Sequence, residues 1–326
     1  MADAAPAIPP ATSAPPETPP PIGGQFLALG RDIKLSHTVF ALPFALWAAV
    51  LAAASVDRRP TWTEAILVLL CMVLARTFAM TVNRLADASF DAQNPRTVGR
   101  AISAGRMTRR FASGAIAVTG LGFVAAAAGF WIFRGNPWPL LLAPAVLALL
   151  ASYSFAKRFT ALCHVLLGVA LASSPIAAAI AIEPSYLGQS TVWWIAGFVA
   201  AWVAGFDVIY ALADRDVDRQ LGLHAIPARF GTAGAVMIAR VLHAVSLVSL
   251  GLAVWGSASL GLATQLAAIA VAGLLITEHV LVASALTKRK TDAAGKEAPL
   301  LHHAFFTVNG VVSLTLGAAG MIDAWP

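Results

Sequence analysis

The amino-acid sequence predicts an all-α polytopic membrane protein, a bundle of about nine transmembrane helices. Of its 326 residues, 59% are hydrophobic and only 12% are charged, whereas soluble domains have about 45–50% and about 25%. The mean hydropathy is +0.76. A soluble globule of this length could not bury so much apolar surface, and a disordered chain would be far more polar. With 25 glycines and 2 cysteines, collagen-like and disulfide-rich folds are also excluded.

Long apolar segments predict the individual helices. A bilayer core of about 30 Å requires about 20 apolar residues in a helix. Lipid admits only helices or closed barrels, because every backbone polar group must be satisfied internally, and these runs are too long for alternating strands. We expect spans at about 36–56, 62–83, 111–133, 138–155, 160–182, 191–212, 232–256, 259–286 and 300–323.

The first 30 residues differ from the rest in composition. Proline and alanine dominate them, which favours a disordered, partly polyproline II tail. They have neither the basic region nor the apolar region of a signal peptide. We therefore expect a disordered Pro/Ala-rich tail at 1–30 and a transmembrane domain at 31–326.

The net charge of +6 comes from basic residues in short loops between apolar runs. This pattern favours a lipid bilayer, and no nucleic acid, as the partner of the basic residues. Lys and Arg gather before the first expected span and after the second, fourth, sixth and eighth, and on the other side lie only Arg58, Arg59 and Arg134. The positive-inside rule then predicts an inner (cytoplasmic) membrane protein with a cytoplasmic N-terminus and an external C-terminus.

Acidic residues are concentrated in two short stretches that both follow a span on the predicted cytoplasmic side. If the second span continues past the membrane surface, Arg76, Asn83, Asp87 and Asp91 share one helical face. The second stretch repeats the spacing after a shift of 127 residues, which suggests an old duplication. We expect Asp207, Tyr210, Asp214 and Asp218 to share one face there.

Carboxylates four residues apart repel each other, and near a low-dielectric medium they require a cation between them. Oxygen ligands favour a hard cation, and Mg²⁺ typically binds a few carboxylates together with substrate phosphates. Neighbouring arginines would bind phosphate oxygens directly. The two stretches therefore indicate a magnesium–diphosphate site, with the basic residues Arg76, Arg84, Arg96 and Arg100.

These residues resemble the motifs of the UbiA superfamily of intramembrane aromatic prenyltransferases. The first motif corresponds to Asn83, Asp87 and Asp91, and the second to Asp207, Tyr210, Asp214 and Asp218. The segments 34–44 and 153–160 resemble 4-hydroxybenzoate polyprenyltransferases, and the similarity extends from about residue 31 to the end. The sequence departs from many members at Arg84 and at His224.

The resemblance implies transfer of a polyprenyl group from a polyprenyl diphosphate to an aromatic acid, 4-hydroxybenzoate or a related naphthoate, in ubiquinone or menaquinone biosynthesis. It implies that Mg²⁺ is held by Asp87, Asp91, Asp214 and Asp218, and that Asp207 hydrogen-bonds the acceptor hydroxyl. Lys157 or Arg158 would bind the acceptor carboxylate. Aromatic rings would line a dry site around the allylic cation. The candidates for these rings are Phe40, Phe44, Phe78, Phe206 and Tyr210.

Other interpretations stay open at this point. The acidic residues could be solvated loop charges, which we prefer for Asp216 because it lies off the shared face. A secondary transporter also contains repeats and intramembrane Asp and Arg residues, but its ionisable groups lie near the bilayer midplane. A non-catalytic scaffold is a third alternative, and in that case no property would depend on Mg²⁺.

Overall fold

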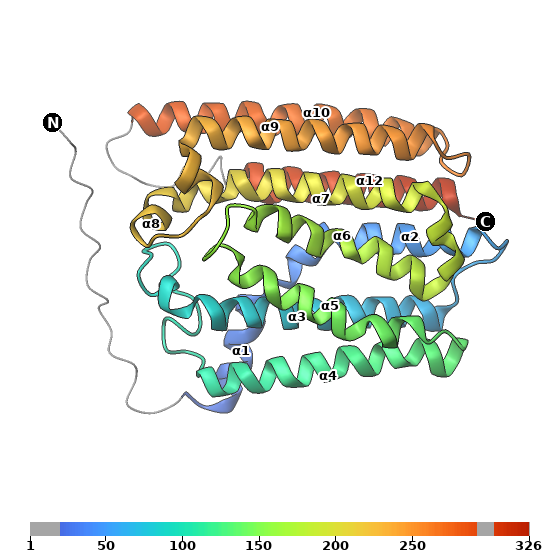
Figure 1. Cartoon of the computed structure of the whole chain (residues 1–326), viewed down its shortest axis with the longest axis horizontal. Coiled ribbons are helices and arrows are strands. Elements are labelled where there is room, and N and C mark those ends of the chain that lie inside the picture. Colours follow the sequence, from blue (N-terminus) through green and yellow to red (C-terminus); the bar gives the residue numbers. More distant parts are fainter. Residues whose placement is uncertain (1–19, 292–302, 326) are drawn as a thin grey trace.

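The computed structural model describes residues 20–291 and 303–325, and every regular element in these ranges is helical. Figure 1 shows long helices that run side by side in one bundle. The α-helices are α1 (Ile22–Ile33), α2 (Leu42–Ala54), α3 (Trp62–Asp91), α4 (Arg109–Arg134), α5 (Trp138–Ala156), α6 (Cys163–Ile182), α7 (Ser190–Ala211), α8 (Arg215–Gln220), α9 (Ile226–Trp255), α10 (Leu262–Thr291) and α12 (Asn309–Ala324). Short 3₁₀ segments are η1 (Leu35–Phe40), η2 (Pro184–Gly188) and η3 (Leu212–Asp214), and a π-helical segment, His303–Val308, precedes α12.

The predicted all-α membrane bundle is confirmed. Among the described residues, 8 helices are long and apolar enough to cross a membrane, and a bent pair brings the number to 9. The exception is the first expected span, 36–56, where the helix is interrupted at Ala41 and only α2 is regular. Pro43 lies in the first turn of α2 and has no backbone N–H, so it favours the start of a new helix there.

The expected boundary of the N-terminal tail at residue 30 is wrong for its last part. Residues 22–33 form helix α1, which buries Gln25, Ala28 and Leu29 and exposes Phe26 and Leu27. The helix forms here because its apolar residues recur at helical spacing on the side that packs on the bundle. The proline-rich part of the expected tail, residues 1–19, lies outside the described residues.

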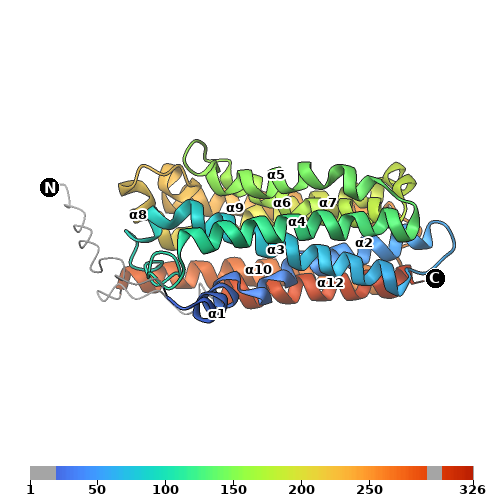
Figure 2. The ribbon, with the colours of Figure 1, turned by 90° about the horizontal axis from the view of Figure 1, so that it is seen from below.

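The segments with the candidate site residues gather at one end of the bundle. In Figure 1, α1, α8 and the connection from α3 to α4 lie together at the left, whereas the C-terminal end of α12 lies at the right. Figure 2 shows the same arrangement after a quarter turn. The two acidic stretches, 127 residues apart in sequence, are therefore neighbours in space.

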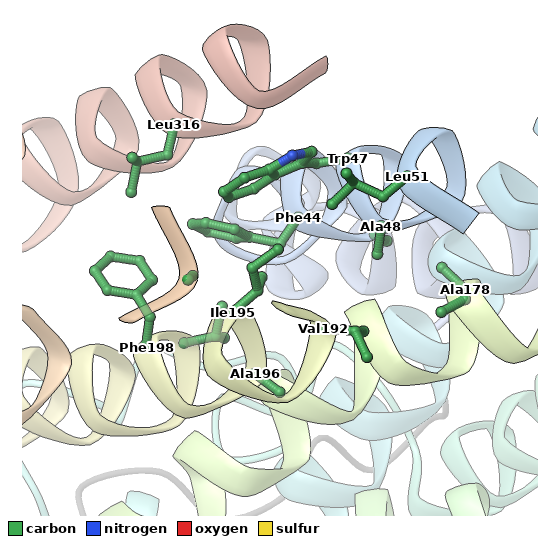
Figure 3. Close-up of a cluster of buried hydrophobic side chains, with 14 of the residues drawn as sticks. Phe44, Trp47, Ala48, Leu51, Ala178, Val192, Ile195, Ala196, Phe198 and Leu316 are labelled. Carbon is green, nitrogen blue, oxygen red and sulfur yellow. The ribbon is translucent and has the colours of Figure 1, made fainter. Parts of the chain in front are cut away.

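The largest apolar core surrounds the short helix α2, which is buried along nearly its whole length. Figure 3 shows the side chains of this core, including Phe44, Trp47, Leu51, Ile195, Phe198 and Leu316. Gly320 of α12 lies so close to the Trp47 indole that a Cβ there would collide with the ring. A small residue is needed for this close approach of α2 and α12, as in other packed membrane helices.

Helices α7, α10 and α12 are also joined by a buried polar chain. The indole N–H of Trp202 donates to Asn309 Oδ1 at 2.7 Å, and Asn309 Nδ2 donates to Glu278 Oε1 at 2.8 Å. Hydrogen bonds between helices inside a membrane contribute on the order of 1 kcal/mol each. They also satisfy polar groups that would otherwise be buried alone.

At the end of the bundle opposite the acidic stretches, Glu64 joins three helices. Its carboxylate is fully buried and accepts hydrogen bonds from Arg58 at 3.0 Å and from Arg134 at 3.0 Å. Arg58 also donates to the carbonyl of Ile182 at the end of α6. Thr61 and Glu64 form a capping box at the start of α3, so Glu64 caps this helix and links it directly to α4, and through Arg58 to α6.

We expect Glu64→Gln to destabilise the fold, because it removes the buried charge that two partly exposed arginines contact. Hydrogen bonds to charged groups contribute about 1.5–3 kcal/mol each. The measurement is the thermal unfolding midpoint of the purified protein in detergent. Glu183→Gln is the matched control, since Glu183 bonds only the neighbouring, exposed Ser185. Equal midpoints for the two variants would contradict a structural role of Glu64.

Candidate functional site

The first acidic stretch has the local structure that its spacing predicts. Helix α3 is continuous from Trp62 to Asp91, so Arg76, Asn83, Asp87 and Asp91 share one face. Both carboxylates are almost completely buried, with Asp87 2% and Asp91 4% exposed. Helix α3 therefore continues past residue 83, where the expected membrane span ends, and carries charged side chains at its C-terminal end.

The second acidic stretch does not form the single regular helix that was expected. Helix α7 ends at Ala211, the 3₁₀ turn η3 follows, and α8 begins at Arg215. A 3₁₀ turn has about three residues per turn instead of 3.6, so it rotates the residues after it relative to a continuous helix. Asp207, Asp214 and Asp218 still line one mixed cavity, so the turn interrupts the regular helix without separating these carboxylates.

The two stretches nevertheless converge on one small polar cavity of about 130 Å³. Its walls come from α3, α7 and α8, from the connection between α3 and α4, and from the end of α5. The sequence-predicted residues that line it are Asn83, Asp87, Asp91, Arg96, Arg100, Lys157, Tyr210, Asp214 and Asp218. Asp216 lies outside it and pairs with its neighbour Arg215, as expected for a solvated charge.

Arg96 is the main partner of Asp214. Its Nε donates to Asp214 Oδ1 at 2.7 Å, a second guanidinium nitrogen contacts Oδ2, and Nη1 donates to the Tyr210 hydroxyl at 2.6 Å. Asn94 Nδ2 adds a hydrogen bond to Asp214 at 2.8 Å. Burial lowers the pKa of Arg96, but the hydrogen bonds and charge of Asp214 outweigh burial and hold that pKa above its usual value. The group therefore stays charged.

The two carboxylates of α3 also have basic partners. Lys157 Nζ lies 2.8 Å from Asp87 Oδ2, and Arg100 Nη1 donates to Asp91 Oδ1 at 2.7 Å. Asn83 contributes a longer hydrogen bond to Asp87, at 3.3 Å. Repulsion between the buried carboxylates is thus offset by cations from two different loops, which fixes the positions of those loops relative to α3.

One oxygen of each α3 carboxylate has no hydrogen-bond partner. Asp87 Oδ1 and Asp91 Oδ2 are buried and unbonded, although a buried carboxylate oxygen normally accepts a hydrogen bond. Within residues 20–291 and 303–325, no group of three or more metal-ligating side chains is preassembled. These oxygens fit a hard cation that shares its ligands with substrate phosphates, which is how Mg²⁺ is commonly bound.

Asp207 belongs to a different part of the site and has a partner that the sequence did not indicate. His164, buried in the first turn of α6, lies with Nδ1 2.6 Å from Asp207 Oδ2. The backbone N–H of Ile226 donates to His164 Nε2 at 3.2 Å. Because that nitrogen accepts a hydrogen bond, Nδ1 must carry the proton and donate it to Asp207. His164 thus holds the Asp207 carboxylate in place.

Arg84 explains one departure from the motif of the first stretch. It is 7% exposed, its Nη1 donates to Asn83 Oδ1 at 3.2 Å, and its Nε lies 3.7 Å from Asp32. Bound to Arg84 through its oxygen, the Asn83 amide directs its nitrogen towards Asp87. Arg84 therefore orients Asn83 and has its own counter-ion. His224, the other departure, has an exposed side chain and does not line the cavity.

Helix α1 holds the connection between α3 and α4, which carries Arg96 and Arg100. Gln25 Oε1 accepts hydrogen bonds from the backbone and side chain of Thr108, both at 3.0 Å. Asp32 Oδ2 accepts from the backbone N–H of Ala101 at 2.8 Å. Asp32 and Gln25 lie in or next to the expected tail, so no motif in the sequence indicated their role.

Two larger cavities follow: a mixed one that shares lining residues with the small polar cavity, and an apolar one that adjoins the mixed one. A mixed cavity of about 540 Å³ is lined by Arg76 and by the aromatic residues Phe40 and Phe206. Four aspartates of the two acidic stretches also line it: Asp87, Asp207, Asp214 and Asp218. An apolar cavity of about 360 Å³ lies among α2, α3, α4, α5 and α6. Phe44 and Phe78, also expected near the site, line none of these cavities and are packed in apolar clusters.

Arg158, expected to bind a substrate carboxylate, lies beside the cavities and lines none of them. It donates to the Ala86 carbonyl at 2.6 Å and packs on the rings of Phe90 and Phe155. Its guanidinium reaches Asp87 only at 4.0 Å. Arg158 therefore joins the end of α5 to α3, whereas its neighbour Lys157 points into the polar cavity.

Comparison with known proteins agrees with this architecture. The model of the UbiA prenyltransferase family matches residues 41–318. A 4-hydroxybenzoate octaprenyltransferase from Chromohalobacter salexigens is 32% identical over 262 residues, which are 79% of this chain and 82% of that protein. A protein of the same name from Dechloromonas aromatica is 32% identical over 233 residues, 70% of this chain and 72% of its own.

Solved structures have the same fold. The apo structure of a UbiA homologue from Aeropyrum pernix K1 is 30% identical, with a TM-score of 0.75 over 89% of this chain and 98% of its own. A UbiA homologue from Archaeoglobus fulgidus bound to GPP and Mg²⁺ is 19% identical, with a TM-score of 0.64 over 91% and 99% of the two chains. With a membrane bundle, two converging acidic motifs and these similarities, the chain belongs to the UbiA prenyltransferase family and is a membrane-embedded prenyltransferase.

Proposed function

We propose that this protein transfers a polyprenyl group from a polyprenyl diphosphate to an aromatic acid, 4-hydroxybenzoate or a related naphthoate, in the biosynthesis of ubiquinone or menaquinone. The observation that carries the proposal is the convergence of Asp87, Asp91, Asp214 and Asp218 on one polar cavity, which a mixed cavity connects to an apolar one. The names of the curated relatives support the aromatic acceptor.

The polar cavity is suited to the diphosphate. Arg96, Arg100 and Lys157 would turn from their carboxylates to phosphate oxygens, with which guanidinium groups form strong paired hydrogen bonds. Asp87, Asp91, Asp214 and Asp218 would then be free to hold Mg²⁺, and a neighbouring structure contains both GPP and Mg²⁺. When bound, Mg²⁺ would neutralise negative charge on the diphosphate as it leaves.

In the reaction, the bond between prenyl C1 and the diphosphate oxygen breaks, and a bond forms between C1 and a carbon of the acceptor ring. The ring carbon then loses its proton to the released diphosphate, which is the second product. Asp207, held by His164, would accept a hydrogen bond from the acceptor hydroxyl and make the ring more nucleophilic. Phe40 and Phe206, whose ring centroids are 5.3 Å apart, would exclude water and present aromatic faces to the cation.

The apolar cavity would take the isoprenoid chain, which has no polar group. The same arrangement counts against a secondary transporter, because the acidic residues gather at one end of the bundle and not at its middle. We further propose that this end faces the cytoplasm, from the excess of Lys and Arg in its loops, and that the protein resides in the inner membrane.

Loss of a carboxylate in the polar cavity should abolish the reaction. Asp87→Asn and Asp214→Asn should each lower prenyl transfer by about 100-fold or more, since they remove stabilisation of the leaving diphosphate, and excess chelator should have the same effect. The measurement is mass spectrometry of the products formed from a polyprenyl diphosphate and 4-hydroxybenzoate by protein in membranes. Asp216→Asn, in the same segment but outside the cavity, is the control. Full activity in chelator, or in either cavity variant, would refute the proposal.

His164 should act through Asp207. His164→Ala should lower kcat by about 100-fold, because a misplaced catalytic group loses most of its effect. His164→Asn should retain much of kcat, since the asparagine Nδ2 can donate to Asp207 from nearly the position of the histidine Nδ1. Steady-state kinetics and the unfolding midpoint should be measured together. Equal losses of kcat in the two variants would mean that His164 does not position Asp207.

A further inference from the structure

Helix α1 has apolar side chains on its exposed side as well as on its buried side. Its buried side packs in a small core with the connection between α3 and α4. On the other side, Ile22, Phe26 and Leu27 are 69%, 61% and 57% exposed. Single exposed apolar residues are common in proteins, but these three lie within two turns of one short helix and form an apolar face. An exposed face of this kind marks contact with a protein or a membrane.

Helix α1 lies at the level of the membrane surface. The core beneath it includes Met80 and Leu85 of α3 and Phe111 of α4. Met80 and Leu85 lie on either side of residue 83, where the expected span of α3 ends, and the expected span of α4 begins at Phe111. In Figure 1, α1 runs across the direction of the long helices. This is the position of an amphipathic helix in the interface of a bilayer.

Basic residues flank the exposed face of α1. Four of them are exposed: Arg31, Lys34, Arg109 and Arg110. Arg31 and Lys34 lie at the C-terminal end of α1. The other two begin α4 beside the N-terminal half of α1, where the ring of Phe26 meets that of Phe111 edge-on with centroids 4.9 Å apart. Among the described residues none of the four forms an ion pair, and no exposed carboxylate lies in residues 20–34 or 99–111. Their charge is therefore available to an external anion.

The buried side of α1 holds the connection that carries the site arginines. Gln25 accepts hydrogen bonds from the backbone and hydroxyl of Thr108, and Asp32 accepts one from the backbone N–H of Ala101. Ala101 directly follows Arg100, which pairs with an aspartate of the polar cavity. In the sequence, Gln25 and Asp32 are immediate neighbours of residues on the exposed side of α1. A contact made by that side therefore bears on the position of the connection.

Anionic phospholipids fit this surface better than other lipids. Interfacial helices bind through burial of their apolar face and through attraction of their basic residues to anionic headgroups. A zwitterionic headgroup carries its own cation beside the phosphate, so its net attraction for arginine and lysine is weaker. The apolar face of α1 can enter either kind of bilayer, whereas the four flanking charges distinguish between them.

We propose that α1 and the start of α4 bind anionic phospholipid headgroups, and that this contact holds the connection between α3 and α4 in place at the polar cavity. The inference goes beyond the proposed reaction, because the binding needs neither donor nor acceptor. In a bilayer without anionic lipid, α1 docks less firmly, and the backbone that carries Arg96 and Arg100 opens more often.

The test compares the full-length protein in nanodiscs of phosphatidylcholine with the protein in nanodiscs of an equimolar mixture with phosphatidylglycerol. Amide hydrogen exchange of residues 99–108 reports opening of the hydrogen bonds to Gln25 and Asp32. We expect exchange to be at least about fivefold slower in the mixture, the factor that the attraction of a single basic residue to an anionic surface contributes. Added salt should reduce the difference, because it screens exposed charges.

A pair of double variants assigns the effect to this surface. Arg109→Gln with Arg110→Gln should remove most of the difference between the two bilayers. Arg219→Gln with Arg229→Gln is the matched control: it removes the same charge from exposed arginines in and after α8, away from α1, and should keep the difference.

Three results would overturn the inference. The first is equal exchange of the wild-type protein in both bilayers, which needs no variant. The second is an equal loss of the difference in the two double variants, which would assign the effect to the total charge of this end. The third is a change of oligomeric state in Phe26→Ser, measured by light scattering, together with equal exchange in both bilayers, which would assign the face to a second copy of the chain. Because exchange is measured without substrate, absence of prenyl transfer would refute the proposed function and leave this inference standing.

Discussion

The site depends on compensation of negative charge in a poorly hydrated place. Four aspartates line one cavity of about 130 Å³, and such carboxylates repel each other strongly where water is scarce. Lys157, Arg100 and Arg96 offset this repulsion, and each belongs to a segment other than the one that carries its aspartate. The ion pairs therefore do more than neutralise charge. They position the connection from α3 to α4, the end of α5, and the turn between α7 and α8.

The same pairs make the site compatible with an anionic ligand. A diphosphate with its cation would give the basic groups new acceptors and the carboxylates a new counter-ion, so total charge compensation is similar before and after binding. Buried groups can exchange partners at moderate cost when none is left alone. The loop with Arg96 and Arg100 can take part in this exchange without leaving the bundle, because Gln25 and Asp32 of α1 hold its backbone.

The sequence was sufficient to predict the bundle, its spans and the convergence of the two acidic stretches. It was also sufficient to predict which polar side chains share one face of α3, because the periodicity of a regular helix determines which side chains lie together. It did not predict the 3₁₀ turn between α7 and α8, although Asp207, Asp214 and Asp218 line one cavity across that turn. It also failed for His164, Asp32 and Gln25, whose partners are distant in sequence and whose own neighbourhoods contain no motif.

Ion pairs with aspartates distinguish basic residues to which the sequence alone gives the same expected role. Arg76, Arg84, Arg96 and Arg100 were all expected to bind phosphate, and they have the same chemistry. In the structure, Arg84 has its counter-ion in Asp32 and orients Asn83, and Arg96 and Arg100 balance aspartates at the polar cavity. Arg76 lies at the boundary between polar and apolar cavities without such a partner. The fold therefore separates these basic residues by their partners: three of the cations, Arg96, Arg100 and Lys157, gather at the polar cavity with the aspartates, whereas Arg76 does not line it.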